Sequence, residues 1–383
     1  MTILPILLLA LSPIQIDGSF HDWPKGITSQ EDPFFYYSLI ELPNEKCLQQ
    51  LAEPQSIELG QYTIIFSPEK KGHGISCKKD GELVSPYEAG VVFAPTTAAT
   101  KFEIRVNKKE KELPKKIFDL SPKGDFRVVS WNVQLGNLLE DKARSSRLLK
   151  ALKPDVLLLQ ELSGGDTPEI LTSFLTKTLG GTWQVTLTES TGTLRHHQLK
   201  SAIATSLHLQ TSELIESGSW RQLKAIFSTI ECKKKPVNFI SLHLRCCGGP
   251  TGEAEQQRQK EATAIQGFIN SHQSPRFVIA GDLNLVGTTK PLEILQCDRF
   301  SVVNAYQPDG LQNATWSDSS SSFTPGRLDW MLYSPQSLEV INCFVLETSD
   351  LLPESLTPYN LLSKDTAQLS DHLPLVADFK IIK

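Results

Sequence analysis

The spacing of apolar residues changes about one third of the way along the chain. Between Pro13 and about Val106, short runs alternate apolar with polar residues, as in Phe102–Val106, and helical periodicity is nearly absent. β-Branched and aromatic residues fill these runs, as in Tyr62–Phe66, and proline and glycine separate them. This pattern predicts a small all-β sandwich domain at the front of the chain.

From Asp125 onward, the pattern instead alternates between buried strands and amphipathic helices. Helical spacing covers Lys142–Leu152, which ends before Pro154, and Gly252–His272. Apolar runs with the length of strands lie between and around these helices, at Phe126–Trp131, Val156–Leu159, Ala202–Ala204, Ala225–Ile230, Val237–Leu242, Phe277–Ala280, Leu328–Tyr333 and Leu373–Phe379. The second part is therefore expected to be an α/β domain with buried sheets flanked by helices.

The length of 383 residues also favours two domains, since one hydrophobic core seldom serves so long a chain. We expect the β-sandwich over residues 13–107 and the α/β domain over residues 124–383. The charged stretch between them, residues 108–123, contains Pro114 and Pro122 and is interpreted as a linker.

The long apolar run Ile3–Leu11 is too short to span a bilayer but fits the apolar core of a signal peptide over residues 1–12. No lysine or arginine precedes the run, and Pro13 would follow the cleavage site, so a first strand or an unstructured end remains the alternative. We expect an exported protein, periplasmic or extracellular; without the signal it would be cytoplasmic.

Composition sets two further bounds. The net charge of −5 provides no overall basic field that would collect nucleic acid, so a nuclease function would have to rest on local chemistry. Seven cysteines do not form a complete disulfide framework, and no zinc-binding spacing is present. Cys47 could pair with Cys77 in an oxidising compartment, and whether the adjacent Cys246 and Cys247 pair or are two small buried side chains is left open.

Six short polar motifs border apolar runs in the second part of the chain. Together they supply the acids, amides and imidazoles that can hold a divalent cation and activate water against a phosphate ester. Any one of them would be a weak signal, but six in order are hard to obtain by chance. They are Ser130-Trp131-Asn132, Leu159-Gln160-Glu161, Ser241-Leu242-His243, Gly281-Asp282-Leu283-Asn284, Arg327-Leu328-Asp329 and Ser370-Asp371-His372.

The metal-binding candidates are Asn132, Glu161 and Asp371. Asn132 and Glu161 follow apolar strands, where ligands gather in sheets of this kind. A carboxylate and an amide oxygen form a suitable partial shell for Mg²⁺ or Mn²⁺. Asp371 is assigned to the metal or to its water. A solvated strand end is the alternative reading of Glu161, and a turn former that of Asn132.

The catalytic candidates are Asp282, Asn284, His243, His372 and Asp329. Asp282 and Asn284 lie two apart after a buried strand, so extended geometry would put them on one face, with Asp282 as general base and Asn284 as its orienting amide. His372 is suited to donate a proton to a phosphoryl oxygen, and Asp329 is the candidate that fixes its other ring nitrogen. His243 is expected to be a second phosphate donor.

From residue 125 to the end, this set resembles the endonuclease/exonuclease/phosphatase family, whose fold is that of pancreatic-type deoxyribonuclease. The resemblance implies a four-layer α/β sandwich of two packed mixed sheets with outer helices. It also implies Mg²⁺-dependent cleavage of a P–O bond by in-line attack of water, and it carries over the roles assigned above motif by motif. Residues His243–Ile265 and Pro325–Trp330 are similar to a bacterial exported branch of the family.

The front part is similar to carbohydrate-binding, sandwich-like modules of exported bacterial proteins. Ile16-Asp17-Gly18 and Asp22-Trp23-Pro24 match their opening, and Phe93-Ala94-Pro95-Thr96 through Val106 matches their end. A glycan ligand is therefore an expectation for this accessory domain.

Three functions compete at this stage. The leading hypothesis is a phosphodiesterase acting on nucleic acid, as a monomer by default. The second is a phosphoesterase acting on phospholipid head groups or inositol phosphates, resembling sphingomyelinase; it is disfavoured because Gly326–Trp330 lacks a Cys-Asp-Arg signature and no long aromatic hairpin for membrane docking is visible. The third is a glycan or surface binder that carries an inactive hydrolase domain.

Overall fold

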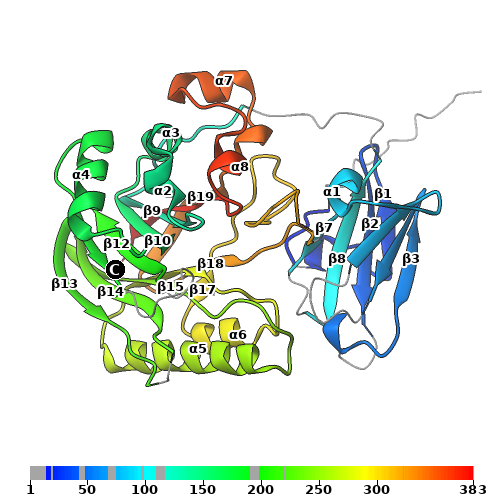
Figure 1. Ribbon diagram of the computed structural model, residues 1–383, viewed down its shortest axis with the longest axis horizontal. Coiled ribbons are helices and arrows are strands. Elements are labelled where there is room, and N and C mark those ends of the chain that lie inside the picture. The colour runs from blue at the N-terminus through cyan, green and yellow to red at the C-terminus, as the bar shows by residue number, and fades with distance from the viewer. Residues whose placement is uncertain are drawn as a thin grey trace, which may run out of the picture.

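The computed structural model describes residues 14–18, 20–42, 48–67, 75–95, 99–108, 117–189, 198–218, 221–321 and 323–382. Figure 1 shows a smaller β body, in blue and cyan, beside a larger body of sheets and helices. The predicted signal peptide, Cys47 and residues 109–116 of the predicted linker lie outside the described residues. The expectation of export and the pairing of Cys47 with Cys77 therefore stay predictions.

The smaller body is the predicted all-β domain. Two four-stranded antiparallel sheets, ordered β1-β2-β8-β7 and β3-β4-β5-β6, enclose a core that includes Ile64, Phe66, Phe102 and Ile104. Alternation in β4 and β8 puts these side chains inside. The strands are β1 (Ser29–Glu31), β2 (Phe35–Glu41), β3 (Gln55–Leu59), β4 (Tyr62–Phe66), β5 (Ile75–Lys79), β6 (Glu82–Val84), β7 (Val92–Ala94) and β8 (Lys101–Asn107), with the short helix α1 at Pro86–Ala89.

The larger body contains two six-stranded mixed sheets. Their orders are β11-β12-β10-β9-β20-β19 and β13-β14-β15-β16-β18-β17. The pairs β9/β10 and β15/β16 are parallel, and the other neighbours are antiparallel. The strands are β9 (Phe126–Asn132), β10 (Val156–Leu162), β11 (Gln184–Leu187), β12 (Lys200–Thr205), β13 (His208–Leu214), β14 (Lys224–Cys232), β15 (Lys235–His243), β16 (Phe277–Asp282), β17 (Ser301–Val302), β18 (Asp329–Tyr333), β19 (Leu338–Val345) and β20 (Leu375–Ile381).

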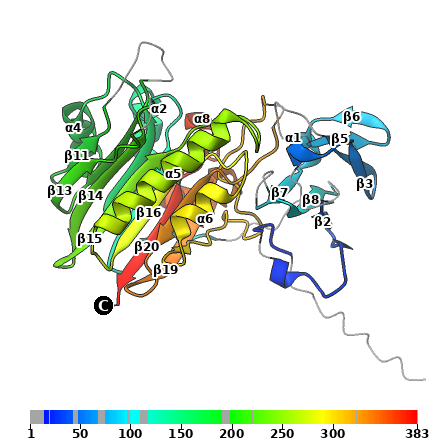
Figure 2. The ribbon, with the colours of Figure 1, turned by 90° about the horizontal axis from the view of Figure 1, so that it is seen from below.

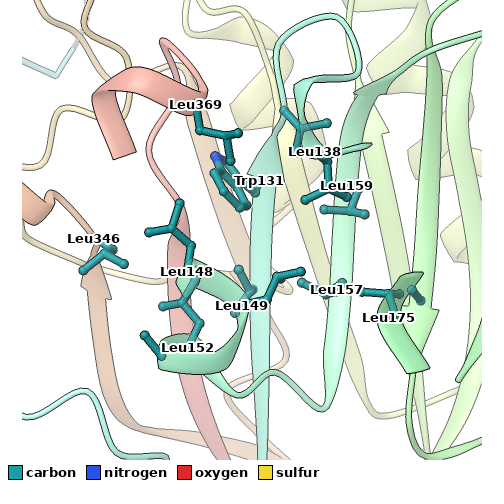
Figure 3. Close-up of a cluster of buried hydrophobic side chains, with 14 of the residues drawn as sticks. Trp131, Leu138, Leu148, Leu149, Leu152, Leu157, Leu159, Leu175, Leu346 and Leu369 are labelled. Carbon is teal, nitrogen blue, oxygen red and sulfur yellow. The ribbon is translucent and has the colours of Figure 1, made fainter. Parts of the chain in front are cut away.

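Helices cover the outer faces of both sheets, which gives the four layers expected for this fold. Figure 2 shows the helices α5 and α6 lying along the second sheet, and Figure 3 shows the apolar contact of the first sheet, where Trp131 and Leu157 face Leu148 and Leu149 of α3. A separate core between the sheets contains Val128, Leu158 and their neighbours. The helices are α2 (Asn137–Glu140), α3 (Lys142–Leu152), α4 (Pro168–Leu179), α5 (Glu253–Ser271), α6 (Lys290–Gln296), α7 (Pro353–Leu356) and α8 (Asp365–Leu369).

Arg127 of the larger domain contacts the end of the predicted linker. Arg127 is fully buried, and its guanidinium donates to the carboxylate of Asp378 and to the carbonyl oxygens of Leu120 and Ser121. Residues 117–123 are therefore packed onto the larger domain. The charge and proline content of this stretch hid that contact, because its partner lies at the other end of the sequence. Among the described residues, no helix has the length and apolarity needed to cross a membrane.

Candidate active site

The strand topology brings the predicted site residues to one edge of the two packed sheets of the larger domain. Asn132 ends β9, and His243 and Asp282 end the parallel strands β15 and β16, where they are register partners. Antiparallel strands begin at this edge, so Asp329, the first residue of β18, pairs with Asp282, and His372 lies just before β20. Residues from both sheets therefore meet where their chains turn.

Glu161 reaches this edge through an irregularity in β10. The pairing of β10 with β12 shifts register between Leu159 and Leu162, and Glu161 has a φ of 58°. The preceding residue, Gln160, points between the sheets instead, and its side-chain nitrogen donates to Ser241 Oγ at 3.0 Å. This bond ties the two sheets together beneath the site.

Glu161, His243 and Asp282 form a compact group of metal-ligating side chains. Their ligand atoms all lie within 4.8 Å of one another. His243 Nε2 is 3.8 Å from Glu161 Oε1 and 3.6 Å from Asp282 Oδ2. Asp282 is 1% exposed, so this group lies at the bottom of the site and not on the open surface.

Asn132 lies between the two carboxylates. Its side-chain nitrogen donates to Glu161 Oε1 at 3.2 Å and to Asp282 Oδ2 at 3.1 Å. Its oxygen accepts from the backbone N–H of Gln134 at 3.1 Å. In this orientation the amide nitrogen donates to both carboxylates. A half-turn of the amide about its last side-chain bond would direct the oxygen, which is the atom that binds a metal, toward them instead.

His372 and Asp329 form a buried pair. The ring Nδ1 of His372 donates to Asp329 Oδ2 at 2.7 Å, and this leaves Nε2 facing Asp282 Oδ2 at 3.8 Å. The backbone of the pair is also held, because Asp329 N donates to Thr315 Oγ1 at 2.9 Å and Trp131 Nε1 donates to the carbonyl oxygen of His372 at 3.0 Å. The contact expected between the imidazole of His372 and the carboxylate of Asp329 is thus present.

Burial and crowding of like charges shift the protonation equilibria at this edge. Burial first, and then the charges of Asp329 and Glu161, raise the pKa of Asp282 to about 8, against the opposing charge of His372. Burial works against a charged His372, but Asp329, Asp282 and Asp371 outweigh it and raise the pKa of that imidazole to about 10. Burial lowers the pKa of His243 well below its usual value, so this ring is neutral near pH 7 and able to act as a ligand or acceptor.

Asn284 and Asp371 take positions that sequence spacing did not anticipate. β16 ends at Asp282, and Asn284 has a φ of 47°, so extended spacing does not relate the two side chains. The backbone N–H of Asn284 donates to Asp282 Oδ1 at 2.9 Å, while its side-chain nitrogen donates to Leu244 O at 3.3 Å. Asp282 is therefore oriented by a main-chain group.

Asp371 lies at the margin of the group. Its Oδ2 accepts from the indole N–H of Trp316 at 2.9 Å, and its backbone N–H donates to Gln134 Oε1 at 3.3 Å. Its Oδ1 is buried and has no hydrogen-bond partner among the described residues. The compact group of ligand atoms within 4.8 Å consists of Glu161, His243 and Asp282, and the assignment of Asp371 to the metal or to its water stays a prediction.

Several residues that hold the site were not singled out from the sequence. Ser370 Oγ donates to the carbonyl oxygen of Asn132 at 2.8 Å and accepts from His372 N at 3.0 Å, so it links two motifs. The position of Ser370 in the motif Ser370-Asp371-His372 could have indicated this role. No sequence pattern marks Thr315 and Trp316, because they belong to an irregular stretch whose contacts are with residues distant in sequence.

The donor set fits a divalent cation. Two buried or half-buried carboxylates, an amide and a neutral imidazole converge, and burial, followed by the nearby charges of Asp329 and Glu161, raises the pKa of Asp282. Glu161 and Asn132 are the residues that would hold the ion, with Asp282 and His243 beside them. Oxygen-rich sets of this kind suit Mg²⁺ or Mn²⁺.

Comparison with known proteins places these observations in a family. A sequence profile of the Endonuclease/Exonuclease/phosphatase family matches residues 129–372. The catalytic domain of human Nocturnin with bound sulfate is 22% identical, covering 68% of this chain and 96% of that one, with a TM-score of 0.48. A family protein from Leptotrichia buccalis is 16% identical, and the match covers 67% of this chain and 99% of that one, with a TM-score of 0.49. The 3′ phosphatase NExo from Neisseria, bound to a product DNA hairpin, is 16% identical. That match covers 67% of this chain and 99% of the other, with a TM-score of 0.48. No curated protein sequence matches the chain.

Proposed function

The chain belongs to the endonuclease/exonuclease/phosphatase family of phosphate-ester hydrolases, and we propose that it is a divalent-metal-dependent phosphodiesterase that cleaves nucleic acid. The observation that supports this most strongly is the meeting of Glu161, His243 and Asp282 within 4.8 Å, opposite the His372–Asp329 pair. These side chains would supply a cation site, a base and a proton donor, the three groups that attack of water on phosphorus requires.

Each residue has a defined task in this proposal. In its ionised form Asp282 accepts the proton of the attacking water, and the N–H of Asn284 keeps its other oxygen in place. A bound cation would favour this form, because it offsets the burial and like charges that raise the pKa of Asp282 to about 8. His372, held charged by Asp329, donates through Nε2 to a phosphoryl oxygen as negative charge grows there. His243 contacts the same phosphate from the neighbouring strand. Bound Mg²⁺ or Mn²⁺ would supply Lewis-acid stabilisation of that charge.

Local positive charge supports an anionic polymer as the substrate. Lys224 is the register partner of His243 across β14 and β15, and it is 8% exposed. After burial, the positive charges of Lys224 and Arg221 also lower the pKa of His243, so both charges act on the site. Lys224 and Arg221 therefore place positive charge beside the acidic site, where it would favour a phosphodiester backbone, and Arg221 is also ion-paired with Glu261 at 2.5 Å.

A substrate panel tests the proposal. The full chain is assayed on single- and double-stranded DNA, RNA, sphingomyelin and bis-p-nitrophenyl phosphate, each with Mg²⁺, with Mn²⁺ and with chelator. We expect cleavage of DNA or RNA and of the nitrophenyl diester with either metal, and none with chelator. Exclusive cleavage of sphingomyelin would replace nucleic acid with a phospholipid as the substrate. No cleavage of any phosphodiester would overturn the proposal and favour a binding protein with an inactive hydrolase domain.

A further inference from the structure

One irregular stretch of the larger domain contacts both the β-sandwich and the catalytic residues. We refer to residues 306–321 and 323–328, which lie between β17 and β18, as the bridging segment. Figure 1 shows these residues between the two bodies, beside β7 of the sandwich and above β18. The sandwich therefore lies against the part of the larger domain that leads into Asp329.

On the sandwich side, the bridging segment is held by main-chain and side-chain hydrogen bonds. Ile16 N donates to Leu311 O at 2.8 Å, and Ile16 forms a parallel bridge with Gln312. The side-chain nitrogen of Asn313 donates to the carbonyl oxygen of Asp17 at 3.1 Å. These contacts are well shielded from water, because Asp17 is 7% exposed and Asn313 3% exposed.

Two tyrosine hydroxyls complete this attachment. Tyr306, from the bridging segment, donates its hydroxyl to the carboxylate of Asp17. Tyr87, from helix α1 of the sandwich, accepts from Asp318 N at 2.8 Å. Burial chiefly raises the pKa of Tyr87 to about 12, with the charges of Asp318 and Asp371 adding to the rise, so the hydroxyl stays neutral.

On the catalytic side, the neighbouring residues of the same segment hold the active-site motifs. Thr315 Oγ1 accepts from Asp329 N at 2.9 Å, and Thr315 O accepts from Leu373 N at 2.7 Å. Trp316 Nε1 donates to Asp371 Oδ2 at 2.9 Å. The residues on either side of His372 and its partner Asp329 are thus held by Thr315 and Trp316.

The two sets of contacts alternate along a very short stretch. Asn313 faces the sandwich, Thr315 and Trp316 face the catalytic motifs, and Asp318 faces the sandwich again. With two residues or fewer separating a sandwich contact from a catalytic one, displacement of one end moves the other. Catalytic groups must be held to a fraction of an ångström, so such displacement would be felt in the rate.

We propose that the β-sandwich is a working part of the catalytic centre, in which Tyr87 and Asp17 are positioning residues that act through the bridging segment on Asp329, Asp371 and His372. This inference rests on the proposed function for its kinetic consequences. It assigns the sandwich a role that does not depend on any glycan ligand.

The test removes hydroxyl groups from the full chain. Tyr87→Phe, Tyr306→Phe and the double variant are compared with Tyr62→Phe, which makes the same chemical change in the buried core of the sandwich on β4. Steady-state kinetics on bis-p-nitrophenyl phosphate are measured well below each melting temperature. Amide hydrogen exchange is followed in peptides that cover residues 313–321 and 370–373.

We expect the double variant to lose roughly ten- to a hundredfold in kcat with KM unchanged, because transition-state positioning is lost and binding is not. Exchange should rise in both peptides, and Tyr62→Phe should behave as the wild type. A rise in KM alone would mean that Tyr87 contacts substrate, and unchanged kcat and exchange, or an equal loss in Tyr62→Phe, would also overturn the proposal. If the wild type cleaves no phosphodiester, the proposed function fails, and the exchange data alone decide this inference. The single variants preserve the test should the double variant not fold.

Discussion

His372 Nε2 lies 3.8 Å from Asp282 Oδ2, although the two residues come from different sheets. Asp282 ends β16 of the second sheet, and His372 precedes β20 of the first. The contact is therefore possible only where the two sheets pack with their edges in register. The site therefore depends on the packing of the two six-stranded sheets against each other, and not on a local loop.

Asp282→Ala removes the proposed general base. We expect kcat on bis-p-nitrophenyl phosphate with Mg²⁺ to fall by about 10²–10⁴-fold or more, since general-base catalysis is worth roughly that factor. Asp282→Asn, which keeps the shape of the side chain and its hydrogen bond with Asn284 N, serves as the matched variant and should lose as much. Circular dichroism checks that both remain folded; an unchanged kcat in either would refute the assignment.

Asp329→Asn tests the His372–Asp329 pair through pH dependence. His372 must be protonated to donate, and the charges of Asp329 and Asp282 overcome burial to raise its pKa to about 10. The wild type should therefore keep this donor at neutral pH and lose activity as the pH rises through about 10. Removing the charge at Asp329 lowers the pKa, so the alkaline limb of the profile of log(kcat/KM) against pH should move to lower pH. An alkaline limb that stays in place, or moves upward, would contradict this role.

Gly281→Ala tests the backbone that carries Asp282. Gly281 has a φ of 151°, and a Cβ there would lie 1.8 Å from the carbonyl oxygen of Leu242 on β15. Because β15 and β16 carry His243 and Asp282, we expect the variant to lose both activity and thermal stability. Gly267→Ala, at a position in α5 where a Cβ meets nothing within 4 Å, is the control and should match or exceed the wild type in stability. A stable, fully active Gly281→Ala enzyme would show that this close approach is not required.

The Arg127–Asp378 pair should dominate the stability of the larger domain. Both side chains are 0% exposed, and their charged atoms lie 2.6 Å apart. Asp378→Ala leaves a buried guanidinium without its counter-charge, so we expect a loss of about 3–5 kcal/mol in the free energy of unfolding by urea. The double variant Arg127→Met/Asp378→Leu should recover most of it. No recovery would mean that the carbonyl contacts of Arg127, and not the charge pair, carry the stability.

Much of the fold was predictable because its signals are local. The sequence pattern predicts the helix over Lys142–Leu152 with its observed bounds, and the predicted strands Phe126–Trp131 and Phe277–Ala280 lie within β9 and β16. Apolar periodicity and a proline decide such elements. The helix at Pro168–Leu179 was missed, although Thr167, Pro168 and Gly180 are capping residues that could have revealed it.

The candidate site was predictable as a set of residues but not as a geometry. The need of a catalytic imidazole for a carboxylate partner predicts Asp329 beside His372, and the two are in contact. The left-handed conformation of Asn284 and the indole of Trp316 on Asp371 depend on turn geometry and on contacts between distant segments. A single sequence does not encode these in any local pattern, so the docking of the β-sandwich beside the site was not anticipated either.

The central claim is that Glu161 and Asn132 hold one divalent cation beside Asp282, and that hydrolysis depends on this cation. The most direct test titrates Mg²⁺ into chelator-treated, dialysed enzyme while binding is followed by calorimetry and hydrolysis of bis-p-nitrophenyl phosphate by absorbance. We predict no turnover before Mg²⁺ is added, binding and turnover that rise together, and at least a tenfold higher Mg²⁺ requirement in Glu161→Gln. Turnover that persists in chelator, or a Glu161→Gln enzyme with the wild-type Mg²⁺ requirement, would contradict the account.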